Sequence, residues 1–387
     1  MTRATASVSP ARRLSEVPRS GIRAAIEAPA SDVVDLAGGD PSFATPAHIS
    51  EAAAQAVRGG QTHYTHGRGE AGLREALARK LALENDLAAV DPKLEIVVTA
   101  GGLNGLAAAF QALLDPGDEV LIPDPGFANY SAQVILAGGR PTPVPLLRER
   151  WSYDFDVLAR AVTPRTRILV VNSPSNPTGA VLARAELEAL AEFASEHDLI
   201  VVSDEAYEAL VYTGSQHSFA ACAGARERTV SVYSFSKTYA MTGWRVGYVV
   251  APPPLAAEIA KVQEHLIGCP SSVSQAAALA ALTGPKEPVS EMVAEYRRRR
   301  DLVAAALDGL PGVTFAAPSG ALYAFPCFEL LGPDPAAALR ERVRVQMVPG
   351  AAFGRNAAQH VRLSFAGDAV ELEEGLARIR QAAGAVG

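Results

Sequence analysis

The sequence has few lysines, few cysteines and no long apolar run. Its 387 residues include three cysteines, Cys222, Cys269 and Cys327, which lie far apart in the chain. Because no two of them have the C-x-x-C spacing of a structural zinc site, we predict no metal site, and isolated cysteines are typical of a reducing compartment. No apolar run approaches the roughly 20 residues that a membrane-spanning helix needs. We therefore expect a cytoplasmic protein that does not bind membranes.

The sequence also lacks the excess of positive charge that marks most nucleic-acid-binding surfaces. It has 35 basic and 42 acidic residues, and its formal net charge at pH 7 is -7. The one basic run, at residues 297–300, follows a helical pattern, and a solvated helix face or a subunit contact explains it better than phosphate binding. We expect no nucleic acid among its partners.

Short apolar runs alternate with amphipathic helical patterns through the middle of the chain. This alternation predicts an α/β fold with a mostly parallel central sheet sandwiched by helices, because the runs are rich in Val, Ile and Leu without a polar face. We predict strands at 95–100, 118–123, 167–172, 199–204, 229–235 and 246–251. From about residue 252 the alternation stops, and long helical patterns are followed by shorter strand-like segments. We predict an N-terminal arm at 1–45 that forms part of a small domain, a large ligand-binding domain at 46–285 and a small C-terminal α+β domain at 286–387.

Distinctive side chains follow several of these predicted strands. Ligands of α/β sheets bind beyond the carboxyl ends of the strands, so these positions are the candidates for a site. Gly101 and Gly102 come after the first strand and begin a helix, whose free amides and positive dipole end suit a phosphate. Asn176 lies in an N-P-T-G turn after another strand, and its bond to proline readily adopts the cis form. Asp204 lies at the end of the next strand. A helix cap would explain this residue, whereas a functional role would require a cationic partner for its carboxylate.

The fifth predicted strand ends at one of only five lysines in the chain. Lys237 follows Ser234 and Ser236, and Arg245 comes soon after. A lysine near an apolar strand end is desolvated, which lowers its pKa and allows its neutral amine to attack a carbonyl, while an arginine provides a fixed cation for a phosphate. A surface turn would explain each residue separately. Their occurrence at one edge of one sheet predicts a common site.

Eight segments, taken together and in order, resemble the fold-type-I pyridoxal-phosphate enzymes, and most closely the class I/II aminotransferases of the aspartate aminotransferase type. The segments cover nearly the whole chain: "GGDPSFATP", "YTHGRGEAGLREALA", "TAGGLNGL", "NSPSNPTGAV", "SDEAYEALVY", "SFSKTYAMTGWRVGY", "GALYAF" and "VRLSFA". The resemblance implies pyridoxal 5'-phosphate as the cofactor. It is specific for the fold and the cofactor and much less specific for the reaction.

The resemblance also implies roles for individual residues. Lys237 would form the aldimine with the cofactor and move the α-proton of the substrate, Asp204 would pair with the pyridine nitrogen, and Tyr207 and Asn176 would hydrogen-bond to the phenolic oxygen. Phe127 would stack on the ring. The phosphate would be held by the glycine-rich helix start and nearby side chains: Gly101, Gly102, Leu103, Ser234, Ser236, Arg245 and, from a second subunit, Tyr64.

On the substrate side, Arg362 would grip the α-carboxylate, with Asn176 beside it. Gly39 would lie where the backbone closes over the substrate, and Ile22 would face the substrate from the segment "SGIRA", acting as a mobile cover. Because Tyr64 would act across a subunit boundary, the resemblance implies a homodimer with shared active sites. Its small-molecule partners would be an amino acid and a 2-oxo acid.

An aminotransferase, which moves the amino group of an α-amino acid to a 2-oxo acid, is the leading functional hypothesis. The alternative is a lyase, replacement, cyclase or oxidase-type enzyme with the same cofactor in a specialised biosynthetic pathway, because pocket shape separates these reactions and the motifs do not. Arg68 and Arg140 are candidates for a second cation that would select a side-chain carboxylate. A transcriptional regulator would need a DNA-binding domain for which residues 1–45 leave no room, and a nicotinamide enzyme would need a G-x-G-x-x-G after the first strand.

Overall fold

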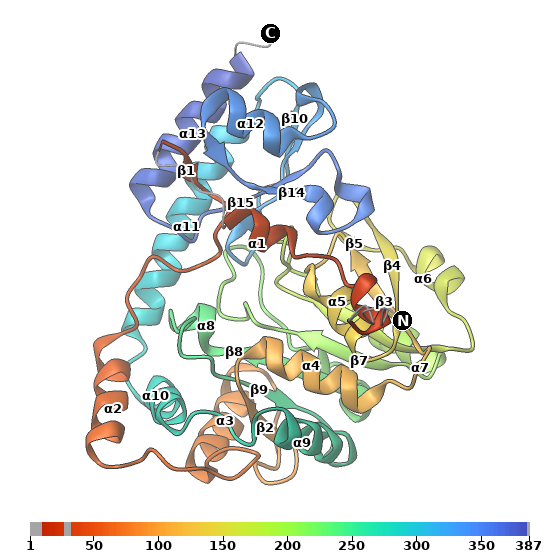
Figure 1. The fold of residues 1–387 in the computed structure, drawn as a ribbon, viewed down its shortest axis with the longest axis vertical. Coiled ribbons are helices and arrows are strands. Elements are labelled where there is room, and N and C mark those ends of the chain that lie inside the picture. The colour runs from red at the N-terminus through yellow and green to blue at the C-terminus, as the bar shows by residue number, and fades with distance from the viewer. Residues whose placement is uncertain (1–9, 27–31, 385–387) are drawn as a thin grey trace, which may run out of the picture.

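The computed structural model describes residues 10–26 and 32–384, and a helix-covered sheet forms its larger part (Figure 1). Residues 1–9 and 27–31 of the predicted N-terminal arm lie outside the described residues. The order of strands across the sheet is β2 (Ile96–Thr99), β9 (Gly247–Val250), β8 (Thr229–Ser234), β7 (Ile200–Asp204), β6 (Thr166–Asn172), β3 (Glu119–Asp124), β4 (Arg140–Leu147) and β5 (Ser152–Tyr153). The six strands predicted from the sequence are all present in this sheet.

The sheet is mostly parallel, as predicted. The pairs β3–β4, β3–β6, β6–β7 and β7–β8 are parallel, while β9 is antiparallel to both β8 and β2. The register aligns Asn172 with Asp204, and Asp204 with Val232, so the carboxyl ends of the parallel strands reach the same edge. Any side chain that follows β6, β7 or β8 is therefore delivered to that edge.

Helices cover both faces of the sheet because successive residues of each strand point to opposite sides. In β6, Ile168 and Val170 join one core cluster, and Leu169 and Val171 join another. The first cluster includes residues of α4 (Gly102–Leu113), α5 (Asn129–Leu136) and α9 (Pro253–Ile267). The second includes residues of α6 (Phe155–Ala161) and α7 (Arg184–Glu196). Because both faces of these strands are buried, their sequences do not alternate between apolar and polar residues.

The strand β4 was not predicted, because its sequence, "RPTPVPLL", contains prolines at alternate positions. The amide of Arg140 donates to the Asp118 carbonyl on the side of β3. Backbone N–H groups alternate in direction along a strand, so the amide positions of Pro141, Pro143 and Pro145 face away from β3. Proline is tolerated there because no ladder hydrogen bond toward β3 is lost.

A second layered region lies above the sheet in Figure 1, coloured cyan to blue. Its helices are α11 (Glu287–Leu307), α12 (Pro335–Val343) and α13 (Ala369–Gly384). Its short strands are β10 (Val313–Thr314), β11 (Tyr323–Ala324), β12 (Cys327–Phe328), β13 (Val345–Gln346), β14 (Val348–Pro349) and β15 (Val361–Ser364). β1 (Val34–Asp35) pairs in parallel with β13, so a segment from the beginning of the chain joins a segment near its end. One core cluster connects this region to Tyr207, which follows β7.

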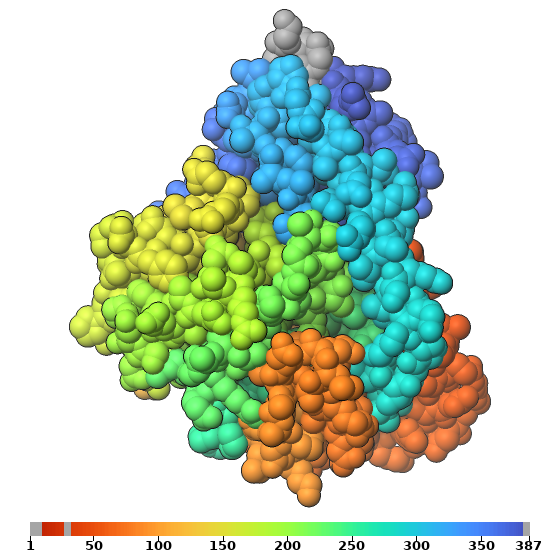
Figure 2. All heavy atoms as spheres, turned by 180° about the vertical axis from the view of Figure 1, so that it is seen from behind, coloured from red at the N-terminus to blue at the C-terminus, as the bar shows by residue number. Residues whose placement is uncertain are grey.

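Three further helices pack beside the β2 edge of the sheet. α10 (Ser272–Thr283) packs against both α2 (Ala47–Arg58) and α3 (Ala71–Glu84). Viewed from behind in Figure 2, the orange segment that contains α3 lies beside the cyan segments, although about 200 residues separate them in the chain. The short helices α1 (Gly21–Ile26) and α8 (Phe235–Thr238) lie near the boundary between the sheet and the upper region.

Among the described residues, none of the helices combines the length and the apolar character needed to cross a membrane. The basic run at 297–300 lies in α11, and its members differ in exposure. Arg299 is buried and donates to Ser42 Oγ at 3.1 Å, to the Ala366 carbonyl at 3.3 Å and to Glu295 Oε1 at 2.8 Å. The interpretation of the run as a solvated face was therefore wrong for Arg299, because this side chain is buried and hydrogen-bonds to groups of the 42 and 366 segments as well as to Glu295 of its own helix.

Candidate active site

The site is built where the carboxyl ends of β6, β7 and β8 meet the amino end of α4. Asn172 and Asp204 are the last residues of β6 and β7, Ser234 is the last residue of β8, and Gly102 is the first residue of α4. The amide side chain of Asn172 holds two of these segments together. Its Nδ2 donates to the Asp204 carbonyl at 2.9 Å, and its Oδ1 accepts from the Asn176 amide at 2.9 Å.

Lys237 extends its amine into the centre of this edge. The side chain leaves α8, directly after β8, and its Nζ donates to the Gly39 carbonyl at 2.7 Å. Burial lowers the pKa of the Lys237 amine, and the positive charges of Arg362 and Arg245 lower it further, against the opposing effects of Tyr323 and Asp40. A lysine with a lowered pKa has a larger fraction of neutral, nucleophilic amine at neutral pH.

Asp204 is a buried carboxyl whose oxygens are held by two donors. The Tyr130 hydroxyl donates to its Oδ2 at 2.7 Å, and the Ala206 amide donates to its Oδ1 at 3.2 Å. Burial raises the pKa of Asp204, and these two hydrogen bonds act in the opposite direction. The carboxyl is therefore oriented before any ligand arrives, and a cation placed next to it would stabilise its ionised form.

A second group of polar side chains surrounds Arg362. Its guanidinium donates to Asn176 Oδ1 at 3.1 Å and to the Ala37 carbonyl at 2.7 Å. The Tyr207 and Tyr323 hydroxyls lie 2.9 Å apart, and burial raises the pKa of Tyr207 well above its usual value. The Asn176–Pro177 bond is cis, as the sequence suggested.

Aromatic rings enclose the Arg362 guanidinium. Its Cζ lies 4.3 Å from the ring centroid of Tyr323 and 5.0 Å from that of Phe353, and only 2% of the residue is exposed. Its Nε is buried and has no hydrogen-bond partner among the described residues. Burial lowers the pKa of Arg362. A buried cation with an unused donor, held flat by aromatic faces, is suited to a carboxylate.

Two glycines at the start of α4 lie beside Arg245 and Ser234, and we call this place the cradle. Gly101 has φ +84°, and a Cβ on this residue would lie 2.7 Å from a guanidinium nitrogen of Arg245. Gly102 lies next to Ser234, since a Cβ on Gly102 would be in ordinary contact with the Ser234 Cβ at 3.5 Å. Ser234 Oγ accepts from the Ser236 amide at 3.2 Å and thereby caps α8. The Arg245 guanidinium donates to the Thr242 carbonyl at 2.8 Å.

The structure brings most of the predicted residues to this edge. Leu103 follows Gly102 in the first turn of α4, and Phe127 lies edge-on to Tyr130 with 5.5 Å between ring centroids. Gly39 packs under Tyr323, since a Cβ on Gly39 would lie 2.3 Å from the Tyr323 hydroxyl oxygen. Ile22 packs against the cluster that contains Phe353 and Ala37.

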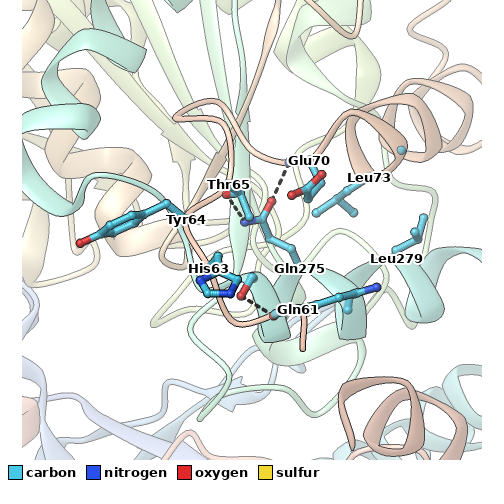
Figure 3. Close-up of a pocket in the computed structure, with 11 residues that line it drawn as sticks. Gln61, His63, Tyr64, Thr65, Glu70, Leu73, Gln275 and Leu279 are labelled. Atoms are coloured by element: carbon cyan, nitrogen blue, oxygen red, sulfur yellow. Dashed lines mark hydrogen bonds between the residues drawn. The ribbon is translucent and has the colours of Figure 1, made fainter. Parts of the chain in front are cut away.

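Tyr64 is the predicted residue that does not join the site within one chain. Its side chain is 95% exposed, and in Figure 3 it points away from Gln275 and Glu70. It lies on a loop that borders a surface hollow lined also by Gln61, His63 and Leu279. A contact of Tyr64 with a cofactor would therefore have to be made outside its own subunit.

The two candidate arginines for a side-chain carboxylate lie away from this edge. Arg140 is the first residue of β4 and is paired with Glu119, the first residue of β3, at the opposite edge of the sheet. Arg68 donates to the Leu94 carbonyl at 2.8 Å, and Leu94 precedes β2. The Arg68 guanidinium and Arg140 therefore lie at the amino ends of strands, at the side of the sheet opposite the site.

Four contributors to the site were not identified from the sequence. Tyr323 contacts three of the predicted residues, Tyr130 orients Asp204, Asn172 holds the turn before Asn176, and Phe353 flanks Arg362. Asn172 could have been identified from the sequence, because it is the last residue of a predicted strand and such residues are candidates for a site. Phe353 and Tyr130 come from segments whose position at the site depends on tertiary packing.

Comparisons with known proteins show the family to which this chain belongs. A model of the family Aminotransferase class I and II matches residues 31–379. The chain belongs to the class I and II aminotransferases. It is 43% identical to the aspartate aminotransferase of Pyrococcus abyssi (strain GE5 / Orsay), with 92% of this chain and 93% of the relative covered.

Other members of the class I and II aminotransferases are similarly close. The aromatic-amino-acid aminotransferase 2 of Thermococcus litoralis is 41% identical, with 90% of this chain and 91% of the relative covered. The solved structure of the aspartate aminotransferase from Thermus thermophilus with maleate has a TM-score of 0.91 and 39% sequence identity, and the match covers 97% of this chain and 100% of that chain. The protein is therefore a fold-type-I aminotransferase that uses pyridoxal phosphate and transfers an amino group between an amino acid and an oxo acid.

The residues of this aminotransferase fit pyridoxal 5'-phosphate. The cradle at Gly101 and Gly102 suits its phosphate, because a Cβ at Gly101 would collide with the Arg245 guanidinium. Asp204 offers a carboxyl group for a protonated ring nitrogen, and Lys237 offers an amine, whose pKa burial lowers, for its carbonyl carbon. No cluster of three or more His, Cys, Asp or Glu side chains that would hold a metal ion occurs at residues 10–26 and 32–384.

Proposed function

We propose that Lys237, Asp204 and Tyr207 are the catalytic residues of this aminotransferase, and that Lys237 carries the cofactor. The observation that supports this assignment is the position of the Lys237 amine at the strand ends, 2.7 Å from the Gly39 carbonyl and within range of the Arg362 and Arg245 charges. The cofactor, when bound, supplies a ring that accepts the electrons released when the substrate loses its α-proton. The protein's side chains do the binding, the orientation and the proton transfer.

In this proposal the Lys237 amine acts twice. It would first hold the cofactor, and once the substrate has displaced it, the freed Nζ would take the α-proton from the substrate and deliver it to the cofactor, not back to the substrate carbon. A lowered pKa is what this second role requires, because a general base works best when its pKa is near the operating pH. Asp204 holds a proton on the ring nitrogen by its negative charge, and the Tyr130 hydrogen bond keeps the carboxylate in place.

The remaining contacts fix the two ligands. Phosphate is held by the amides of Gly102 and Leu103, the hydroxyls of Ser234 and Ser236 and the Arg245 guanidinium, with Gly101 leaving room for it. Phe127 packs on the ring, and the side chains of Asn176 and Tyr207 bind its phenolic oxygen. Arg362 takes the α-carboxylate of the substrate, since its unpaired Nε supplies a free donor beside the two bonds already made. Gly39 and Ile22 line the substrate side and help to exclude water.

The direct test is Lys237→Ala, measured as the visible absorption of the purified holoenzyme and as single-turnover transfer from an amino-acid donor. We expect the variant to lose the covalently bound cofactor and all turnover. Lys261→Ala is the matched control, because Lys261 is an exposed lysine paired with Glu258 on α9. A Lys237→Ala variant that transfers amino groups at the wild-type rate would contradict the assignment.

For the substrate we propose an α-amino acid of the dicarboxylic or aromatic kind as donor and a 2-oxo acid as acceptor. This proposal rests on the relatives named as aspartate and aromatic-amino-acid aminotransferases. Within one chain the Arg68 side chain donates to the Leu94 carbonyl before β2, and Arg140 begins β4 at the amino end of that strand, so we assign neither to a side-chain carboxylate in its own site. A panel of amino acids, each assayed for conversion of the holoenzyme to its amino form and for the mass of the oxo-acid product, tests the proposal. Release of ammonia with every donor would contradict it.

We also propose that the enzyme is a homodimer in which Tyr64 of each subunit binds the cofactor phosphate of the other. The exposure of Tyr64 and its position on a loop outside its own site support this arrangement. Analytical ultracentrifugation of the holoenzyme tests the oligomeric state. A monomer at micromolar concentration with full activity would rule out the shared site.

The cytoplasm is the compartment that we propose. The three cysteines are free, and two of them, Cys222 and Cys327, are buried, which is typical of proteins kept in a reducing environment. Burial raises the pKa of the Cys222 thiol to about 11, so it is a poor nucleophile and resists oxidation. Cell fractionation with a specific antibody checks the compartment.

A further inference from the structure

A buried network of charged and polar side chains lies next to the turn that carries Asp204 and Tyr207, and the proposed mechanism does not use it. Lys80 of α3 forms an ion pair with Glu208 at 2.5 Å, and the two side chains are 9% and 14% exposed. Lys80 also donates to Asn85 Oδ1 at 2.7 Å. The Lys80 Nζ lies 5.2 Å from the ring centroid of Tyr233, a residue of β8.

The network continues to Glu205 through a chain of hydrogen bonds in one direction. Asn85 Nδ2 donates to Glu208 Oε2 and to Ser218 Oγ, each at 2.7 Å. Ser218 in turn donates to Glu205 Oε2 at 2.7 Å. Glu205 also accepts from Ser203 Oγ at 3.0 Å and from the Phe219 amide at 3.2 Å. Both carboxylates of the network thus have fixed donors.

The position of these carboxylates in the sequence connects the network to the site. In "DEAYE" at 204–208, Asp204 and Tyr207 contact site residues, whereas Glu205 and Glu208 contact the network. The members of each pair are three residues apart in the chain. The side chains of the first pair therefore leave the turn in one direction, and those of the second pair leave it in another. Backbone bonds close the turn, since the Glu208 amide donates to the Glu205 carbonyl at 3.1 Å. Any movement of Glu205 or Glu208 must shift the residue that precedes it.

We propose that Lys80 and Glu208 are positioning residues of this aminotransferase, which hold the 204–208 turn so that Asp204 and Tyr207 meet the cofactor in a fixed orientation. This inference rests on the proposed roles of Asp204 and Tyr207. The network lies on the side of the turn away from the ligand, where supporting hydrogen bonds lock the side chains that do the chemistry. Without Lys80, the Glu208 carboxylate, which is only 14% exposed, loses the cation that it pairs with in this structure. We expect its side chain to move toward water, and this movement shifts the turn.

The test compares the holoenzymes of Lys80→Met and Glu208→Gln with the wild type. Glu208→Gln preserves the volume of the side chain and removes its charge, so it keeps the test decisive if Lys80→Met does not fold. For each variant, steady-state kinetics separate kcat from KM, and the visible circular dichroism of the bound cofactor reports its orientation. Thermal unfolding is recorded in parallel. Lys261→Met, which removes the exposed partner of Glu258 on α9, is the matched control and is expected to behave as the wild type.

We expect kcat to fall roughly tenfold in both network variants, with KM for the amino acid nearly unchanged, because Arg362 is outside the network. We also expect weaker visible circular dichroism and faster loss of cofactor on dialysis. Wild-type kcat, dichroism and cofactor retention in Glu208→Gln, with only a lower unfolding temperature, would overturn the proposal and leave the network a purely structural role. A wild-type enzyme whose cofactor is not attached to Lys237 would instead contradict the proposed function, so the two failures are distinguishable.

Discussion

At the scale of single residues, the environment of each side chain decides its chemistry. Arg362 is a charged residue that is 2% exposed, and two aromatic rings and two hydrogen bonds hold it in place. Lys237 is one of five lysines in the chain, and its burial lowers its pKa. Neither property belongs to the amino acid alone, and both would be lost on a solvated surface.

We predict that Arg362→Lys impairs use of the amino-acid substrate far more than binding of the cofactor. Lysine keeps the charge but lacks the planar fork that binds a carboxylate with two parallel hydrogen bonds. Loss of one charged hydrogen bond of about 1.5–3 kcal/mol corresponds to a fall of roughly ten- to hundredfold in kcat/KM. Steady-state kinetics with varied donor concentration measure the effect. An unchanged KM would remove Arg362 from the substrate site.

We predict that Tyr130→Phe moves the acid limb of the kcat profile to higher pH. The Tyr130 hydroxyl stabilises the ionised Asp204 carboxyl, whose pKa burial already raises. Without this donor the pKa of Asp204 rises further, so at a given acidic pH less of the carboxylate is available to hold the proton on the ring nitrogen. Tyr153→Phe is the control, because that hydroxyl donates to the Val170 carbonyl and not to Asp204. A limb that stays in place or moves to lower pH would contradict the role of Tyr130.

At the scale of secondary-structure elements, the start of α4 and a loop held by hydrogen bonds position residues of the candidate site. The start of α4 is where we propose that the phosphate binds, because Gly101 adopts φ +84° and carries no Cβ. The loop at 61–70 is fixed by α9 and α10. Gln263 donates to the Gly67 carbonyl at 2.9 Å, and Gln275 accepts from the Glu70 amide at 2.7 Å and donates to Thr65 Oγ1 at 3.0 Å (Figure 3).

We predict that Gly101→Ala weakens cofactor binding about tenfold. The left-handed backbone costs a side-chain-bearing residue about 1–2 kcal/mol, and the new Cβ also pushes Arg245 out of the cradle. Equilibrium dialysis of the apoenzyme with the cofactor measures the change. Gly72→Ala in α3, where a Cβ would meet nothing within 4 Å, is the matched control. Equal affinities for the two variants would show that the phosphate binds elsewhere.

We predict that Gln275→Ala lowers the free energy of unfolding by about 1–3 kcal/mol, because the Gln275 side chain is buried and the Glu70 amide and the Thr65 hydroxyl lose their partner. Urea denaturation measures this change, and amide exchange at Glu70 locates it. Gln55→Ala, at an exposed glutamine of α2, is expected to change stability little. Similar losses in the two variants would indicate that the loop is not braced by Gln275.

At the scale of the whole molecule, the site lies where the sheet and the upper region meet. Arg362 comes from β15 of the upper region, Lys237 follows β8 of the sheet, and Gly39 comes from the segment between β1 and α2. The division of the chain at residues 45 and 285 stays a prediction, although β1 pairs with β13. The site therefore needs segments from both parts of the chain.

If subunits share their sites, mixing two inactive variants must restore activity. Lys237→Ala lacks the amine, and Tyr64→Ala lacks the tyrosine that we assign to the partner's site. In a mixed dimer one site combines both defects, while the other takes its lysine and its tyrosine from intact positions. We therefore predict that subunit exchange between the purified variants restores turnover at one site per mixed dimer. No gain after verified exchange would contradict the shared site.

Much of the fold and the centre of the site could be predicted from the sequence. The six predicted strands are present, and Asp204 and Lys237 lie at one edge because the parallel strands β7 and β8 end there, whereas Arg362 comes from β15 of the upper region. The prediction failed where tertiary contacts override local pattern. The prolines of β4 are compatible with a strand only because their amide positions face away from β3, and Arg299 is buried only because Ser42 and Ala366 approach it.

The sequence by itself determined which residues can do chemistry and in what order strands and helices follow one another. The reason is local: an apolar run, a glycine before a helix and a strand-end lysine have consequences within a few residues of themselves. Only the tertiary structure decided that Tyr323 lies over Gly39 and beside Tyr207, that Arg68 and Arg140 lie away from the site, and that Lys80 supports the 204–208 turn. These contacts join residues far apart in the chain, and local propensity carries no information about such distances.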